Sequence, residues 1–138
     1  MTPRPGVVLA VDVGTVRVGV AASDPDRVLA SPVETVPAPG HDRVLALIAE
    51  RDAVLVLVGL PTSMSGASAS ASADMARSWA ATLADRSAVP LQLVDERLTT
   101  VTAQAALRAS GRRGPAARRV IDQAAAVALL QGFLDRPR

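Results

Sequence analysis

Residues 7–19 read Val-Val-Leu-Ala-Val-Asp-Val-Gly-Thr-Val-Arg-Val-Gly, and this stretch decides what kind of fold the chain can form. The valine-rich run predicts a buried strand over Val7–Val13, joined by Gly-Thr-Val to a second strand over Arg17–Ser23. A buried carboxylate is costly unless something compensates it. Asp12 therefore predicts a metal ion, a hydrogen-bonded loop or a cation beside it. We favour the first ligand of a metal-dependent phosphate chemistry; a carboxylate that caps the hairpin turn is the alternative.

The rest of the chain alternates between strand and helix patterns. Further strands are expected over Val28–Val36, Ala53–Leu60 and Leu91–Glu96. Helices are expected over Asp42–Arg51, Asp74–Arg86, Thr99–Ala109 and Pro115–Leu134. An antiparallel start followed by strand–helix alternation predicts an α/β fold, a mixed sheet flanked by helices, in one domain over residues 1–138. Pro32 would confine the third strand to a sheet edge, and Ser63–Ala73 reads as a loop.

Composition excludes several classes of function. The chain has no Cys, which excludes disulfides and thiolate metal sites. No apolar run is long enough for a membrane span, so we expect a cytoplasmic protein without a membrane partner. The high pI reflects the use of Arg instead of Lys, because the formal net charge is only +2. The one histidine, His41, precedes a predicted helix and reads as a loop or cap residue, and the serines have no second base to activate them.

Arginines gather in one stretch. Between Glu96 and Asp122 there is no acidic residue. The six arginines of this stretch are Arg97, Arg108, Arg112, Arg113, Arg118 and Arg119. This local basic patch either contacts phosphate groups or is a solvated helix face. Trp79 and Met75 fit the buried stripe of a helix, which leaves little aromatic surface for base stacking; a nucleic-acid contact would rest on arginines and backbone.

Three carboxylates stand apart from the surface charges: Asp12, Glu96 at the end of a strand, and Asp122 on a largely apolar helix. With no His or Cys near them in the sequence, such a cluster favours Mg²⁺ or Mn²⁺. Two such ions can activate water and stabilise the leaving oxygen in phosphodiester cleavage. Strand alternation favours Glu96 over Asp95 as the ligand.

Each of the later two carboxylates also has a structural interpretation. Asp122 could pair with Arg118 or Arg119, one helical turn earlier. Glu96 could pair with Arg97 or cap the helix that is expected from Thr99.

Four motifs in order resemble the YqgF family of bacterial ribonuclease-H-like proteins. They are Val-Asp-Val-Gly-Thr-Val-Arg-Val-Gly (11–19), Val-Gly-Leu-Pro (58–61), Val-Asp-Glu-Arg-Leu-Thr-Thr (94–100) and Val-Ile-Asp-Gln-Ala-Ala-Ala (120–126). The resemblance covers nearly the whole chain and implies a five-stranded mixed sheet with flanking helices. It also implies that Asp12, Glu96 and Asp122 are the catalytic, metal-binding carboxylates.

The resemblance extends to the residues that would contact the substrate. It implies that Thr15, Arg17 and Arg97 line the site and contact phosphate. Arg112, Arg113, Arg118 and Arg119 stand where the family has a basic stretch before its final Asp. The segment Thr62–Ala73 keeps Met64 and Gly66 but is otherwise rich in Ser and Ala, which departs from the family pattern.

The implied activity is hydrolysis of phosphodiester bonds at the 5′ end of pre-16S rRNA during ribosome biogenesis. One alternative is a Holliday junction resolvase acting on branched DNA, which should work as a two-fold dimer. A monomer and a homodimer both remain open. Another alternative is a non-catalytic RNA-binding module. Asp-x-Gly-Thr also resembles the phosphate-binding turn of the actin and sugar-kinase superfamily, but those proteins enclose ATP between two domains.

Overall fold

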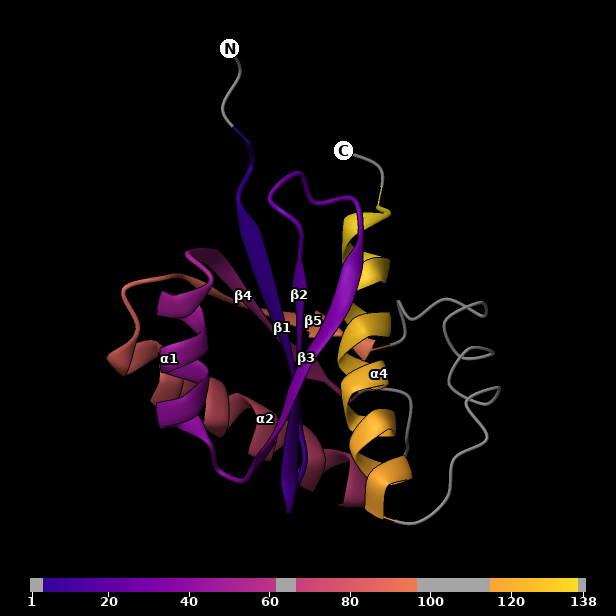
Figure 1. Ribbon diagram of the computed structural model, residues 1–138. Helices are drawn as coiled ribbons and strands as arrows, with labels where there is room; N and C mark the ends of the chain where they lie inside the picture. Colours follow the sequence, from indigo (N-terminus) through magenta and orange to yellow (C-terminus); the bar gives the residue numbers. More distant parts are fainter. Residues whose placement is uncertain (1–3, 62–66, 97–114, 137–138) are drawn as a thin grey trace.

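The structure is a computed structural model that describes residues 4–61, 67–96 and 115–136 (Figure 1). For 67–70 and 115–122 the description covers the helical backbone alone. The predicted helix over Thr99–Ala109 lies outside the described residues.

Five strands form one mixed sheet in the order β3-β2-β1-β4-β5. The strands are β1 (Val7–Val13), β2 (Arg17–Ser23), β3 (Ala30–Pro37), β4 (Ala53–Leu60) and β5 (Leu91–Asp95). The first three pair antiparallel, whereas β1 pairs parallel with β4 and β4 pairs parallel with β5. This arrangement confirms the predicted mixed five-stranded sheet, with β1 at its centre.

Helices cover both faces of the sheet. Helices α1 (His41–Glu50) and α2 (Ala67–Arg86) pack on one face, and α4 (Pro115–Leu134) packs on the other (Figure 1). We call these the α1/α2 face and the α4 face. The central strand serves both faces: Leu9 and Val11 are buried beneath α1 and α2, whereas Val8 and Ala10 are buried beneath α4. In the described part of the chain, no helix is long and apolar enough to cross a membrane.

The core beneath α1 and α2 matches the helical spacing of the sequence. Val44, Leu47 and Ile48 of α1 are buried, as their spacing predicts. On α2, the prediction of a core role is confirmed for Trp79, which is buried. Met75, one turn earlier, is only half-buried.

The prediction of a loop over Ser63–Ala73 was wrong from Ala67 onward, because α2 begins there. Alanine has the highest intrinsic helix propensity, and alternating Ala and Ser residues show no apolar stripe that would reveal the helix in the sequence. Ala73 and Ala76 are buried against the sheet. Their packing supplies the tertiary contacts that the sequence pattern does not show.

The third strand begins at Ala30, two residues later than predicted. Val28 and Leu29 are exposed and belong to the turn after β2. Their backbone N–H groups both donate to Oδ1 of Asp24, at 2.8 Å. The carboxylate of Asp24 thus takes two N–H groups that would otherwise be available for hydrogen bonds between β2 and β3. Pro32 does lie on an edge strand, as predicted, next to an irregularity in the β2–β3 register.

Candidate functional site

Strand alternation places Asp12 on the α4 face near the end of β1. Val8 and Ala10, which share its side of the strand, are buried under α4. Asp12 itself is half-buried and pairs with Gly19 of β2. The carboxylate therefore lies near the C-terminal end of β1, just beyond the part of this strand that α4 buries.

Glu96 follows β5, and its side chain reaches the same place from the other side of β4. Val94, two residues earlier, is buried on the α4 face, as alternation requires. The side chain of Glu96 lies over Gly59 of β4 and forms a hydrogen bond with Asp12. The structure thus brings together two of the three predicted carboxylates, although 83 intervening residues separate them in the sequence.

The surroundings raise the pKa of Glu96 above its ordinary value. Burial is the main cause, because it disfavours the charged form. The hydrogen bond with Asp12 acts in the opposite direction, and the negative charge of Asp95 raises the pKa further. A hydrogen bond between two carboxyl groups requires a proton on one of them. A divalent cation could replace that proton, so the pair fits a site for a hard metal ion.

Asp122 lies in α4 by its backbone, one turn before Ala126, which is fully buried against the sheet. Its side chain is outside the described part. The next residue, Gln123, donates from Nε2 to Oγ1 of Thr35 at 3.0 Å. Thr35 pairs with Gly19, the partner of Asp12. This hydrogen bond therefore ties α4, one residue after Asp122, to β3 at the level of the Asp12–Gly19 pair.

Among the residues whose side chains the structure describes, no group of three acidic or His residues is placed to hold a metal ion. The contact between Asp12 and Glu96 supplies two members of the predicted set. The third predicted member, Asp122, belongs to the side chains not described. Its assignment as a ligand stays a prediction.

The turn between β1 and β2 holds Thr15 and Arg17 at the same edge of the sheet. The N–H of Gly14 donates to the carbonyl oxygen of Arg17 at 2.9 Å, and a Cβ at Gly14 would lie only 2.6 Å from that oxygen. The tight turn therefore requires glycine. Thr15 is exposed at its tip. Arg17 is half-buried. It lies on the same side of β2 as Gly19 and Ala21, because every second residue of a strand shares a face, and this side is the α4 face that carries Asp12.

The remaining predicted phosphate contacts are not tested by the structure. Arg97, Arg112 and Arg113 lie outside the described residues. Arg118 and Arg119 belong to the first turns of α4, where only the backbone is described.

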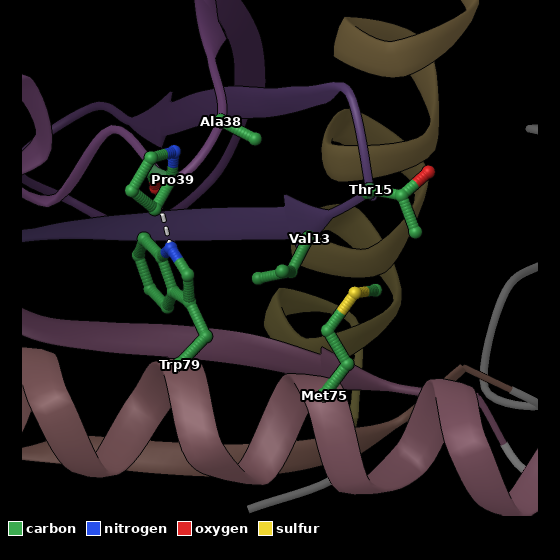
Figure 2. A pocket seen from close by; sticks show the side chains of 7 residues that line it. Val13, Thr15, Ala38, Pro39, Met75 and Trp79 are labelled. Carbon is green, nitrogen blue, oxygen red and sulfur yellow. Dashed lines mark hydrogen bonds between the residues drawn. The ribbon is translucent and has the colours of Figure 1, made fainter.

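The sequence did not reveal a small apolar pocket on the opposite, α1/α2 face (Figure 2). It has a volume of about 270 Å³ and is lined by Val13, Gly14, Thr15, Ala38, Pro39, Met75 and Trp79. Figure 2 shows the side chains of Val13 and Met75 at its wall, with the hydroxyl of Thr15 pointing away from both. The sequence carries no signal for this pocket, because Met75 continues the apolar stripe of Trp79 there and its half-buried state is seen only in the structure.

His41 supports the wall of this pocket rather than capping α1. The N-cap of α1 is Gly40, and His41 is the first helical residue, so the cap interpretation was wrong. Its ring stacks on Trp79 with centroids 4.6 Å apart, and Nε2 lies 3.1 Å from the carbonyl oxygen of Trp79. The indole N–H donates to the carbonyl oxygen of Pro39 at 2.6 Å. These contacts hold the indole ring in place.

Comparison with known proteins now decides the family. Residues 6–136 match the sequence model described as "RuvX: Holliday junction resolvase". The chain belongs to this family. A relative from Thermobifida fusca is 56% identical over 98% of this chain and 91% of its own length, and it is named "Putative pre-16S rRNA nuclease". A relative from Mycolicibacterium smegmatis with the same name is 51% identical over 99% of this chain and 84% of its own length. The family expected from the four motifs is thereby confirmed, and it is a nuclease family.

The fold is similar to that of solved RuvC structures. RuvC from Thermus thermophilus, solved in complex with a Holliday junction substrate, matches with a TM-score of 0.59 at 17% identity, over 93% of each chain. A second RuvC structure from Thermus thermophilus matches with a TM-score of 0.58 at 17% identity, over 92% of this chain and 93% of that chain. At this identity the likeness concerns the fold alone, and it confirms the ribonuclease-H-like arrangement expected for this RuvX member.

Proposed function

We propose that the protein is a metal-dependent nuclease that hydrolyses phosphodiester bonds at the 5′ end of pre-16S rRNA, in the cytoplasm, during ribosome biogenesis. The observation that carries the chemistry is the contact between Asp12 and Glu96. Two carboxylates from distant segments meet at the polar edge of a sheet in a member of a nuclease family. The names of the close relatives support the choice of substrate.

The donor set fits Mg²⁺ or Mn²⁺. Carboxylate oxygens are the ligands that these hard ions prefer, and the only histidine, His41, stacks on Trp79 at the opposite face of the sheet. Asp12, Glu96 and Asp122 would hold the metal. Bound there, it would activate water and stabilise the leaving oxygen of the phosphodiester.

The protein residues then have separate tasks. With a metal ion in place of the shared proton, Asp12 and Glu96 would both be ionised and would concentrate negative charge at the metal. Arg17, on the same face as Asp12, would bind a phosphate group and align the backbone of the substrate. Thr15 and Arg97 would contribute further phosphate contacts at this edge.

The basic stretch before Asp122 would bind the substrate more broadly. If Arg112, Arg113, Arg118 and Arg119 contact phosphates, each contact releases counterions on binding. Replacing Arg112 and Arg113 by Gln should reduce the slope of log K against log salt by about 0.7 per lost contact with single-stranded RNA. An unchanged slope would mean that these arginines are solvated surface.

A second candidate function is resolution of branched DNA, which the description of the family favours. The chemistry at Asp12 and Glu96 would be the same. The difference lies in assembly, because a resolvase that cuts two strands symmetrically should act as a two-fold dimer. A homodimer is therefore expected if the substrate is branched DNA, whereas cleavage of pre-16S rRNA requires only a monomer.

The deciding experiment is cleavage of a labelled pre-16S rRNA 5′ segment and of a four-way DNA junction, each with Mg²⁺, Mn²⁺ or EDTA. The wild type is compared with Asp12→Asn, and Asp52→Asn is the matched control. Asp52 is exposed and has a φ of 52°, a conformation that Asn adopts readily. Asp12→Asn should lose about 10³-fold in rate, because it removes a charge that stabilises the transition state by several kcal/mol.

The outcomes separate the candidates. Cleavage of RNA alone, abolished by EDTA and by Asp12→Asn, supports the processing nuclease. Paired symmetric cuts in the junction support the resolvase. Binding without cleavage of either substrate supports a non-catalytic RNA-binding module. Full activity of Asp12→Asn would show that the metal centre is assigned to the wrong residues.

A further inference from the structure

Glu96 reaches Asp12 only by crossing a whole strand. Asp12 lies on β1 and Glu96 follows β5, with β4 between them in the sheet. Neighbouring strands are about 4.8 Å apart, so β1 and β5 are separated by about 10 Å. The hydrogen bond between the two carboxyl groups must therefore form above the backbone of β4. The size of the side chain that β4 presents at that point therefore bears on the path of Glu96.

The residue at the crossing point is Gly59. It pairs with Val94 of β5, and the preceding residue, Val58, pairs with Val11 of β1. Gly59 thus lies in the same part of the sheet as Asp12, between the two carboxylate-bearing segments.

The space above Gly59 is filled by the side chain of Glu96. A Cβ at this position would lie 3.0 Å from Oε1 of Glu96 and 3.4 Å from its Cγ. Its third neighbour would be Cδ2 of Leu129 in α4, at 3.1 Å. Leu129 is buried in the core beneath α4 and has little freedom to move away. Glu96 has its flexible carboxylate end at the contact, so Glu96 is the side chain that would be displaced.

We propose that Gly59 is a positioning residue of the nuclease site: its missing side chain is what allows the Glu96 carboxylate to lie across β4 and meet Asp12. This inference rests on the proposed function for its consequence, since a misplaced Glu96 should weaken metal binding. The positioning itself is a property of the metal-free protein. The backbone of Gly59 has no positive φ, so glycine is not required there for conformational reasons.

The first test is the metal-free position of the carboxylates. The carboxyl ¹³C resonances of Asp12 and Glu96 are compared between the wild type and Gly59→Ala, at one fixed pH in EDTA. Both resonances should shift in Gly59→Ala, because the contact between the groups is broken. The carboxyl resonance of Glu34, which is bound to Arg43, is the internal control and should not move. Unchanged resonances of both Asp12 and Glu96 would overturn the proposal.

The second test is the affinity for Mn²⁺, measured by titration calorimetry. Gly59→Ala should bind Mn²⁺ about 10- to 100-fold more weakly, the range found when residues that orient metal ligands are replaced. In a Glu96→Gln background, Gly59→Ala should cause no further loss, because the residue through which it acts has already been changed. An equal loss in both backgrounds would contradict positioning through Glu96.

Leu129 provides the control for an effect through α4. Leu129→Val removes the second close contact while leaving the site residues untouched, and alone it should change the Mn²⁺ affinity less than twofold. Gly59→Ala/Leu129→Val should bind as weakly as Gly59→Ala. Restored affinity in this double variant would place the cause in helix packing and overturn the proposal. If the wild type binds no Mn²⁺, the proposed metal centre fails, whereas the carboxyl resonances still decide the role of Gly59.

Discussion

The two faces of the sheet are built from the same strands but differ sharply at the carboxyl edge. On the α1/α2 face, Val11 and Val13 of β1 join a continuous apolar core. On the α4 face, Asp12 lies between them in the chain and contacts Glu96 above Gly59. Because side chains alternate along a strand, one face can carry charge without interrupting the core on the other. The same strand thereby serves stability on one side and the proposed chemistry on the other.

The largest effect is expected on the rate of substrate cleavage, when the replacement of Glu96 is compared with the replacement of its neighbour Asp95. Asp95 and Glu96 are adjacent, yet alternation gives only Glu96 the face that carries Asp12. Glu96→Gln should lower the cleavage rate about 10³-fold. Asp95→Asn, the matched control, should lower it less than tenfold, because Asp95 acts on Glu96 only through its charge. Equal losses in single-turnover assays would show that the two faces are not separated at this edge.

The contribution of each face to the free energy of unfolding can be compared at one buried leucine on each side of the sheet. Leu83 of α2 and Leu130 of α4 are both fully buried, in separate cores. Leu83→Ala and Leu130→Ala should each lower the free energy of unfolding by about 2–5 kcal/mol. Only Leu130→Ala should also lower the cleavage rate of the folded protein, by about tenfold, because α4 carries Asp122. Urea unfolding and cleavage below the transition test this; a similar loss of cleavage in Leu83→Ala would contradict it.

The carboxyl pair should also respond to pH. The pKa of Glu96 is raised by burial and by Asp95, so its proton stabilises the metal-free fold. That stabilisation is complete below the ordinary pKa of Glu and is lost as the pH rises through the raised value. In EDTA, Glu96→Gln should therefore melt at a higher temperature than the wild type at pH 7, and the difference should shrink toward pH 4. If the difference in melting temperature between Glu96→Gln and the wild type stays the same from pH 7 to pH 4, the pKa of Glu96 is not raised.

Adding Mn²⁺ at pH 7 gives the complementary result. The metal should raise the melting temperature of the wild type, since it binds the folded state, and should have little effect on Glu96→Gln. Asp52→Asn should respond as the wild type does.

The smallest effect concerns a carboxylate that has a cation as its partner. Glu34 accepts from Nε and Nη2 of Arg43 at 2.8 Å, and the hydrogen bond to Arg43 lowers its pKa. This stabilisation is present above the ordinary pKa of Glu and is lost as the pH falls, opposite to Glu96. Both side chains are partly exposed, so Glu34→Gln should cost only about 0.5 kcal/mol at pH 7. Glu50→Gln, which removes the longer 3.3 Å contact with Arg43, is the control and should cost less.

Much of the architecture could be predicted from local patterns. The valine-rich hairpin of β1 and β2 and the short apolar run of β4 have the length and β-branched content of strands, and the apolar stripe of α1 has helical spacing. The start of α2 was missed because Ala and Ser carry no such period. The start of β3 was misjudged because the side chain of Asp24, and not the apolar pattern, sets where the turn ends.

For the site, the sequence by itself determined the family and the kinds of donor. Four motifs in order identified a member of the family that the comparisons confirm, and alternation along the strand favoured Glu96 over Asp95. Such features depend on neighbours along the chain. Only the tertiary structure decided that Glu96 crosses β4, that Gly59 leaves room for it, and that Trp79, with His41 stacked on it, lines a pocket on the other face. These contacts join residues that are distant in sequence, and their existence depends on strand order and packing, which no local pattern encodes.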